Sequence, residues 1–88
     1  MSLQQLRYFV TVAEEEHVTR AAARLHVSQP PLSRQIRALE SELGHALFER
    51  KGRGVVLTAF GREFSERASA ILRHVDDVLA EVKARASD

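Results

Sequence analysis

The stretch that decides the fold is residues 26–40, which read HVSQPPLSRQIRALE. Ser28 is a residue type that caps helix N-termini, and Pro30 and Pro31 fit the first turn of a helix, where backbone amides have no intrahelical partner. Apolar residues recur at helical spacing after the prolines, at Leu32, Ile36, Leu39 and Leu43. The pattern predicts a helix over residues 29–43 with its apolar face against a core, ended by the glycine that follows.

The opposite face of this predicted helix is polar, and its only charges before Glu40 are arginines. The outward positions are Gln29, Pro30, Ser33, Arg34 and Arg37. A stiff first turn can present proline ring carbons and a glutamine amide to DNA base edges, and an arginine one turn further can reach guanine through two hydrogen bonds. Two simpler interpretations stay open: the prolines only start a helix, and Arg37 pairs with Glu40 or Ser41.

Two further helical patterns precede this helix. One covers residues 3–15, where Ser2 and Gln5 have the spacing of a capping box. The other is short, over residues 19–25, and its small alanines let it cross a neighbouring helix closely. Only residues 26–28 separate it from the next helix, which is the arrangement of a helix-turn-helix: the second helix enters the DNA major groove and the first crosses the backbone.

Hydroxyl groups around this turn are suited to DNA phosphates. Contacts of this kind position a protein on the duplex without reading its sequence. The candidates are Thr19 at the start of the short helix, with the free backbone amides there, and the hydroxyls of Ser28 and Ser33.

The apolar period changes after Gly44. Residues 47–50 and 55–57 are short β-prone pieces that flank the loop sequence KGRG at residues 51–54, where glycines permit the positive φ angles of a tight turn. We expect a small hairpin there. A lone Gly-Arg-Gly is also compatible with a plain hairpin tip that binds nothing.

A long helical pattern follows, which Thr58 caps and which runs to about Ala84. Its apolar stripe consists of Phe60, Phe64, Ala68, Ile71, Leu72, Val75, Val78, Leu79 and Val82. At 1.5 Å per residue such a helix is about 40 Å long, more than the body of so small a domain can cover. We expect the stripe from Phe64 to Val82 to pair two copies, with the aromatic pair Phe60 and Phe64 also packing back onto the first helix.

Composition limits the classes of function. The chain has 88 residues, of which 44% are hydrophobic and none is cysteine, so we expect one small domain without disulfides or thiolate metal sites. Its net charge is only +1, but residues 18–39 hold four arginines and no acid, a clustering that suits a polyanion partner or an ordinary solvated surface. No stretch approaches the roughly 20 apolar residues of a membrane span, and no leader is recognisable, so we expect a cytoplasmic protein.

An enzyme is not expected. The histidines at 17, 26, 45 and 74 lie on different predicted elements without metal-ligand spacing, and no serine, histidine and acid are grouped as a nucleophile with its base. We therefore expect no catalytic residue, no metal ligand and no cofactor.

Three motifs occur in the order and spacing of one family: AAARLHVSQPPLSRQIRALE at 21–40, LGHALFER at 43–50 and LTAFG at 57–61. By these motifs nearly all of the chain resembles the N-terminal winged helix-turn-helix domain of bacterial LysR-type transcriptional regulators. The resemblance implies a mainly α fold, with three helices and a two-stranded wing over residues 1–57 and a long linker and dimerisation helix over 58–88. It also implies that a C-terminal effector-binding domain, the part that takes a small inducer, is absent from this chain.

The resemblance implies DNA-binding residues and partners as well. The positions that match its base-reading residues are Gln29, Pro30, Pro31, Ser33 and Arg34. Arg53 in the wing would approach the minor groove, and Arg37 and Arg50 are candidate phosphate contacts. The implied partners are double-stranded promoter or operator DNA with an interrupted inverted repeat and a second copy bound through the long helix. A tetramer is open to the full-length protein, and no membrane partner is implied.

A rival interpretation is a protein-interaction module, in which the long helix forms a functional coiled coil and the N-terminal half is only a cap. Salt-dependent binding to duplex DNA separates the two, because DNA reading requires it and the interaction module does not.

Overall fold

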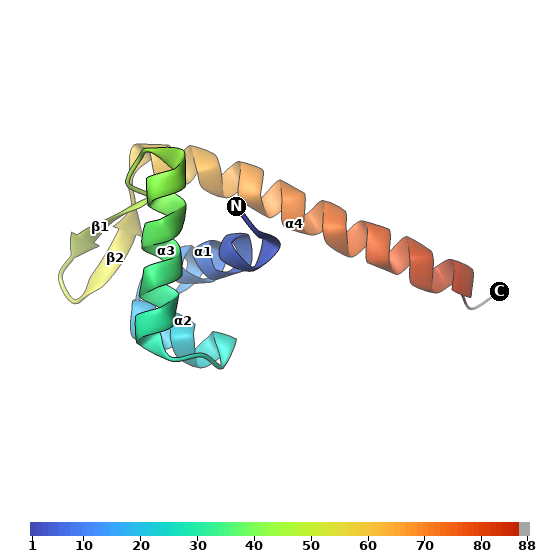
Figure 1. Cartoon of the computed structure of the whole chain (residues 1–88), viewed down its shortest axis with the longest axis horizontal. Helices are drawn as coiled ribbons and strands as arrows, with labels where there is room; N and C mark the ends of the chain where they lie inside the picture. Colours follow the sequence, from blue (N-terminus) through green and yellow to red (C-terminus); the bar gives the residue numbers. More distant parts are fainter. Residues whose placement is uncertain (87–88) are drawn as a thin grey trace.

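The computed structural model describes residues 1–86, which form four helices and one antiparallel hairpin (Figure 1). In chain order these are α1 (Leu3–Glu15), α2 (Val18–Leu25), α3 (Gln29–Leu43), β1 (Phe48–Lys51), β2 (Gly54–Leu57) and α4 (Ala59–Ala86). The predicted fold class, mainly α with a winged helix-turn-helix and a long final helix, is confirmed. The last two residues of the predicted 58–88 segment lie outside the described residues.

The starts of α1 and α2 are set by side chains that accept backbone hydrogen bonds. Ser2 and Gln5 form the predicted capping box, in which each side chain accepts from the backbone N–H of the other residue. α2 begins one residue earlier than expected, because His17 is the N-cap and its Nδ1 accepts from the backbone N–H of Arg20 at 3.3 Å. Histidine is not among the usual capping residues, which is why the sequence left this start open.

α3 has the predicted bounds. The prolines occupy its first turn and Gly44 ends it in the left-handed conformation, with φ 74°. Ser28 is at the N-cap position, but its side chain makes no capping hydrogen bond. The predicted inward face is confirmed, since Leu32 and Leu39 are fully buried and Ile36 is 8% exposed.

The core is centred on Phe9 of α1, which is fully buried. Its ring lies 5.4 Å, between centroids, from Phe48 of β1 and also 5.4 Å from Phe64 of α4. The other buried hydrophobic residues are Leu6, Val12, Ala21, Ala22, Leu32, Ile36, Leu39, Leu47 and Ala68. One aromatic ring of α1 therefore ties the hairpin and the long helix to the helix-turn-helix.

The hairpin pairs Phe48 with Leu57 and Lys51 with Gly54. Its two glycines serve different purposes, which corrects the expectation that both supply a positive φ. Gly52 has φ 60°, as a tight turn requires. Gly54 has no positive φ; a side chain there would collide with the backbone carbonyl of Glu16. That carbonyl accepts a hydrogen bond from Val55 N–H at 3.0 Å, so the wing is fixed against the corner between α1 and α2.

α4 leaves the hairpin at an angle set by its first turn. The Thr58 hydroxyl accepts from Gly61 N–H at 2.9 Å and donates to the carbonyl of Ala46 at 2.7 Å. Gly61 lies so close to the Leu47 carbonyl that a side chain would collide with it. The helix has 28 residues and extends well beyond the body of the molecule (Figure 1).

Only the first part of α4 packs into the body. Ala68 is fully buried within its own chain and so has no surface left for a second copy, whereas Phe64 contacts Phe9 and is half-buried, and its place in a dimer surface stays a prediction. The expected packing of Phe64 onto α1 is confirmed, whereas Phe60 stacks on His45, with ring centroids 4.3 Å apart.

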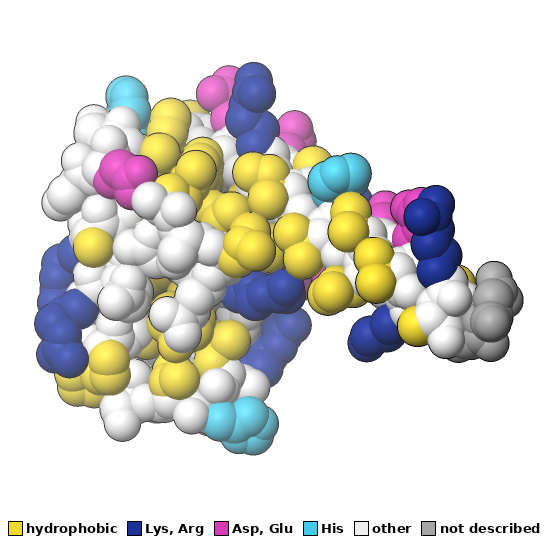
Figure 2. Space-filling model, turned by 45° about the vertical axis from the view of Figure 1, so that its right-hand side comes forward, with side chains coloured by type: hydrophobic (Ala, Val, Ile, Leu, Met, Phe, Trp, Pro, Cys, Tyr) yellow, Lys and Arg dark blue, Asp and Glu magenta, His cyan; other side chains and the backbone are white. Residues whose placement is uncertain are grey.

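The later part of the stripe is uncovered. Figure 2 shows hydrophobic side chains following α4 toward its free end. The most exposed of them are Ile71 (40%), Val78 (43%), Leu79 (49%) and Val82 (57%).

Candidate nucleic-acid interface

The outward face of α3 is open to solvent. Of the residues predicted to read bases, Gln29, Pro30, Pro31 and Arg34 are exposed and Ser33 is half-buried. The leucines on the opposite face are buried in the core, and this burial fixes the orientation of α3. The first turn of α3 and the side chain of Arg34 are therefore accessible to a partner.

The basic cluster of residues 18–39 divides into two pairs. Arg24 forms ion pairs with Glu14 at 2.9 Å and Glu15 at 3.3 Å, and its hydrogen bond to Glu14 raises the pKa of the Arg24 guanidinium. Arg20 donates to the backbone carbonyl of Glu15 at 3.4 Å. These two arginines thus tie α2 to the end of α1.

Arg34 and Arg37 have no such partner. Within residues 1–86, neither guanidinium makes an ion pair or a hydrogen bond to the protein, and the suggested pairing of Arg37 with Glu40 or Ser41 is not formed. Both side chains are exposed. Arg34 and Arg37 on α3 therefore carry exposed positive charge without a protein partner among residues 1–86, and Arg20 has only a backbone carbonyl as its acceptor.

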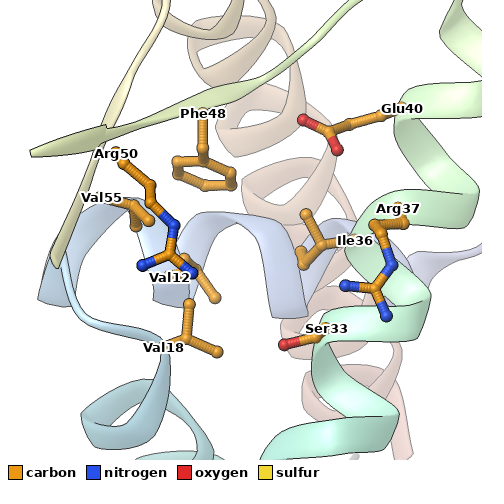
Figure 3. Close-up of a pocket in the computed structure, with 9 residues that line it drawn as sticks. All are labelled: Val12, Val18, Ser33, Ile36, Arg37, Glu40, Phe48, Arg50 and Val55. Atoms are coloured by element: carbon orange, nitrogen blue, oxygen red, sulfur yellow. The ribbon is translucent and has the colours of Figure 1, made fainter. Parts of the chain in front are cut away.

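A pocket of about 260 Å³ lies between α3 and the hairpin (Figure 3). Arg37 and Ser33 border it from α3 and Arg50 borders it from β1, over a floor that includes Val12 and Ile36. Two guanidinium groups from different elements thus face one hollow that is large enough for a phosphate group. The two guanidinium groups at its border offer positive charge and hydrogen-bond donors to a phosphate of the DNA backbone, whereas the rest of the lining is apolar apart from Ser33 and the Glu40 carboxylate.

A smaller pocket of about 190 Å³ adjoins the first and shares its Arg50. It gathers four predicted DNA-binding residues from three elements: Thr19 at the start of α2, Gln29 at the start of α3, and Arg50 and Arg53 of the hairpin. The hydroxyl of Thr19 lies beside the N-terminus of α2, where free amides favour an anion. The two pockets adjoin along Val18, Arg50 and Val55 and together extend from α3 to the wing.

The predicted residues thus fall into groups. The pockets bring together Thr19, Gln29, Ser33, Arg37, Arg50 and Arg53. Arg34, Pro30, Pro31 and Ser28 border neither pocket and lie exposed along α3 and its N-cap. Figure 2 shows one group of lysine and arginine side chains at the edge of the molecule opposite the free end of α4, and others beside the hydrophobic side chains and near that end. The predicted DNA-binding residues lie on residues 19–53 and the exposed apolar residues of the stripe on residues 71–82.

Two neighbouring residues were not found from the sequence. His17 borders the smaller pocket and caps α2. Glu40 borders the larger pocket, is half-buried, and accepts a hydrogen bond from Leu47 N–H at 2.7 Å. The carboxylate joins the end of α3 to the residue before β1 and so helps to set how these two elements meet. Its spacing of seven residues from Leu47 carries no motif that could have predicted this.

Other kinds of site find no support within the described part of the chain. No group of three or more histidine, cysteine, aspartate or glutamate side chains among residues 1–86 is placed to hold a metal ion. None of the helices formed by these residues is long and apolar enough to cross a membrane.

α2 and α3 are joined by a short turn, the outward face of α3 is exposed, and a hairpin with exposed arginines adjoins them. This arrangement defines a winged helix-turn-helix protein. The model of the "bacterial regulatory helix-turn-helix protein, lysR family" matches residues 3–62. The chain belongs to this family.

Individual relatives agree. The chain is 54% identical over 87 residues to the HTH-type transcriptional regulator ClcR of Pseudomonas putida; the match covers 99% of this chain and 29% of that protein. It is 49% identical to the regulator BsdA of Bacillus subtilis, again covering 29% of the relative. Among solved structures, the BenM DNA-binding domain in complex with catB site 1 DNA has a TM-score of 0.95 and 48% identity, covering 100% of this chain and 98% of that one. The chain thus spans less than a third of these curated relatives and nearly all of that domain.

Proposed function

We propose that the chain binds double-stranded DNA sequence-specifically, as the DNA-binding part of a transcriptional regulator. The observation that carries the proposal is the outward face of α3, where Arg34 and Arg37 are exposed and unpaired within the described chain. It adjoins a hairpin whose Arg50 borders the same pocket as Arg37 and whose Arg53 borders the smaller pocket beside Gln29. One α-helix fits the major groove, and a basic hairpin beside it reaches the flanking backbone and minor groove.

The contacts divide into readers and anchors. Gln29, Pro30, Pro31, Ser33 and Arg34 face the base edges from the exposed side of α3. Thr19, Arg37 and Arg50 hold phosphates around the pockets, Ser28 holds one at the exposed N-cap of α3, and Arg53 enters the minor groove. The proposed readers all lie on α3, and two of them, Gln29 and Ser33, also border the pockets that the proposed anchors line.

The proposal includes a homodimer formed through α4. Within residues 1–86, Leu72 is the last residue of α4 that packs against the core, so the apolar side chains beyond it need another cover. Residues 1–57 would then be the DNA-binding unit and 58–88 the dimerisation helix, although the first turns of α4 also belong to the core. The role is binding and not catalysis, and its place is the cytoplasm, where bacterial DNA lies.

The test is selection from a random duplex library followed by titration of the selected site at several salt concentrations. The proposal expects an enriched motif with two-fold symmetry and an affinity that falls steeply with salt, because phosphate contacts release counterions. Equal binding to all duplexes would contradict sequence-specific recognition. An absence of salt-dependent binding would favour the protein-interaction module instead.

A further inference from the structure

The tip of the hairpin meets the corner between α1 and α2 through one close backbone approach. Gly54 opens β2, and a Cβ atom there would overlap the carbonyl oxygen of Glu16, which is backbone and cannot swing aside as a long side chain can. The next residue, Val55, donates its N–H to that same oxygen at 3.0 Å. The missing side chain of Gly54 is therefore what lets the strand come near enough for this hydrogen bond.

The corner that receives the hairpin is itself held in place. Glu16 ends α1 in the left-handed conformation, with φ 54°. The carbonyl of Glu15 before it accepts a hydrogen bond from Arg20 of α2 at 3.4 Å, and His17 after it caps α2. Since the corner is bonded to α2 on both sides of Glu16, a side chain added at the hairpin should move the hairpin and not the corner.

The hairpin is held by fewer contacts than the corner. Among residues 1–86 the sheet has two strands, so β1 has no partner strand at its outer edge. The base of the hairpin is closed by the Thr58 N–H, which donates to the Leu47 carbonyl at 3.0 Å. Nearer the turn, the bond from Val55 is the backbone hydrogen bond that joins the described hairpin to another element. Loss of that bond should therefore let the tip shift about its base.

Arg53 depends on this contact because it lies between the two glycines of the turn. Gly52 before it has φ 60°, and Gly54 after it lies against the corner. Arg53 and Gly54 border the smaller pocket together, across from Gln29 at the start of α3. The approach of Gly54 to the corner thus sets how far Arg53 stands from α3.

We propose that Gly54 is a positioning residue for DNA binding: by admitting the Glu16 carbonyl it fixes the spacing between Arg53 and α3, so that both meet one duplex together. The inference rests on the proposed function, because DNA is the common partner of the two elements. Gly54 acts through Arg53 and needs no contact with DNA. A spacing that is set before binding adds affinity, since the hairpin then has less freedom to lose.

The first experiment is a double-mutant cycle on the full chain and on a duplex selected from a random library. Arg53→Ala should weaken binding by about 10-fold, as expected for one hydrogen bond from a charged group. Gly54→Ala should weaken binding by a similar factor and leave the base preferences of α3 unchanged. The two losses should not multiply in the double variant, because a displaced Arg53 has no contact left to lose.

Gly44→Ala is the matched control, because it makes the same chemical change at the end of α3. Gly44 has φ 74°, and a Cβ there would meet nothing within 4 Å, so alanine strains the backbone without a collision. Gly44→Ala should lower the melting temperature, and any loss of binding that it causes should multiply fully with that of Arg53→Ala. The control separates lost stability from a displaced hairpin.

A second variant removes the hydrogen bond without adding an atom to residue 54. Replacing Val55 by its α-hydroxy acid, in a chemically assembled chain, exchanges the N–H donor for an ester oxygen and keeps the side chain. It should weaken binding by about 3- to 10-fold, in line with one hydrogen bond. This loss, too, should not multiply with that of Arg53→Ala.

The second experiment needs no DNA. Hydrogen exchange followed by NMR should show the Val55 amide exchanging about 10-fold faster in Gly54→Ala than in the unaltered chain, because its acceptor is lost. The amide of Ile36, in the middle of α3, should keep its rate.

The possible results separate this inference from the function on which it rests. If no duplex is bound selectively, the proposed function fails, and the inference fails with it even where the Val55 amide behaves as expected. If binding is selective, three results overturn the inference alone. These are full binding by Gly54→Ala, losses at positions 54 or 55 that multiply with that of Arg53→Ala, and a Val55 amide whose exchange Gly54→Ala leaves unchanged.

Discussion

Arg34 and Arg37 are neighbours on α3, yet they should contribute to binding in different ways. Arg34 stands clear of both pockets, whereas Arg37 borders the larger one beside Arg50. We predict that Arg34→Ala costs about 1 to 3 kcal/mol on the selected site and relaxes preference at one base pair per half-site, because a bidentate contact with guanine is lost. Arg37→Ala should weaken all sequences alike and lower the salt slope by about one.

Titrations on the selected site and its single-base variants, at several salt concentrations, measure both effects. The two arginines serve as controls for each other, since each replacement removes the same charge from the same helix. A uniform loss across all duplexes on Arg34→Ala would make Arg34 a phosphate anchor and deprive α3 of its guanine reader.

His26 offers a test of stability that does not involve the DNA contacts. It ends α2 in the left-handed conformation, with φ 57°, and its side chain is exposed. A residue with a Cβ is strained in that region and glycine is not. We predict that His26→Gly raises the free energy of unfolding by about 0.5 to 1 kcal/mol, less than the full strain because glycine also loses more backbone freedom on folding. Urea denaturation measures it, and a decrease would contradict the strain argument.

Residue types predicted helix ends that depend on local contacts but not those that depend on contacts between distant parts of the chain. The capping box at Ser2 and the glycine that ends α3 depend only on residues close in the sequence, so their residue types predict them. The left-handed ends of α1 and α2 fall on Glu16 and His26, which carry no such signal. The Glu16 carbonyl is held by Val55 N–H from the hairpin, a contact between distant parts of the chain that no local pattern contains.

At the scale of elements, the wing should respond to DNA shape. Arg53 lies in the hairpin turn and is exposed, while Val55, two residues further on, is hydrogen-bonded to the corner after α1. A rigid hairpin can place a guanidinium in a narrow minor groove, whose negative potential is strongest in A-tracts. We predict that Arg53→Ala lowers affinity most on sites with an A-tract beneath the wing and leaves the base preferences of α3 unchanged.

Paired titrations on sites that differ only in the A·T content of the flank measure this effect. Lys51→Ala is the matched control, because Lys51 is an exposed cation of the same hairpin and should weaken both flanks equally. If Arg53→Ala behaved like Lys51→Ala, the wing would be a phosphate contact and not a minor-groove reader.

The elements were predictable to a greater extent than the site between them. Periodicity predicted α1 and α3 with their observed bounds and the hairpin nearly so. The sequence did not show that Arg20 and Arg24 are engaged by the end of α1, because the crossing of α2 over α1 decides that. The pockets likewise depend on how α3 and the hairpin meet, which Glu40 helps to set from seven residues away.

At the scale of the whole molecule, the length of α4 and the size of the body do not match. The 28 residues of the helix span about 42 Å at 1.5 Å per residue, whereas the smaller dimensions of the molecule are 25 and 19 Å. The body covers Phe64 and Ala68 but leaves Ile71, Val78 and Leu79 exposed. A stripe of this kind on a free helix calls for a partner helix, and a second copy presents the same stripe.

We predict that the chain sediments as a dimer at micromolar concentration and that Ile71→Asp dissociates it, because the interface would bury an unpaired carboxylate. Ile71 is 40% exposed within one chain, so the folded body should tolerate the change and retain its helical circular dichroism. Ala70→Asp is the matched control: it adds the same charge one residue away, at an exposed position off the stripe, and should leave the dimer intact.

A dimer places two copies of α3 about a two-fold axis, so the selected DNA should contain inverted half-sites one helical turn, about 34 Å, or a multiple of it apart. Ile71→Asp should then bind a single half-site as well as the unaltered chain does but lose the gain from the second half-site. A monomeric chain with α4 fully formed would contradict the prediction, and an enriched motif without two-fold symmetry would show that two copies do not read the DNA together.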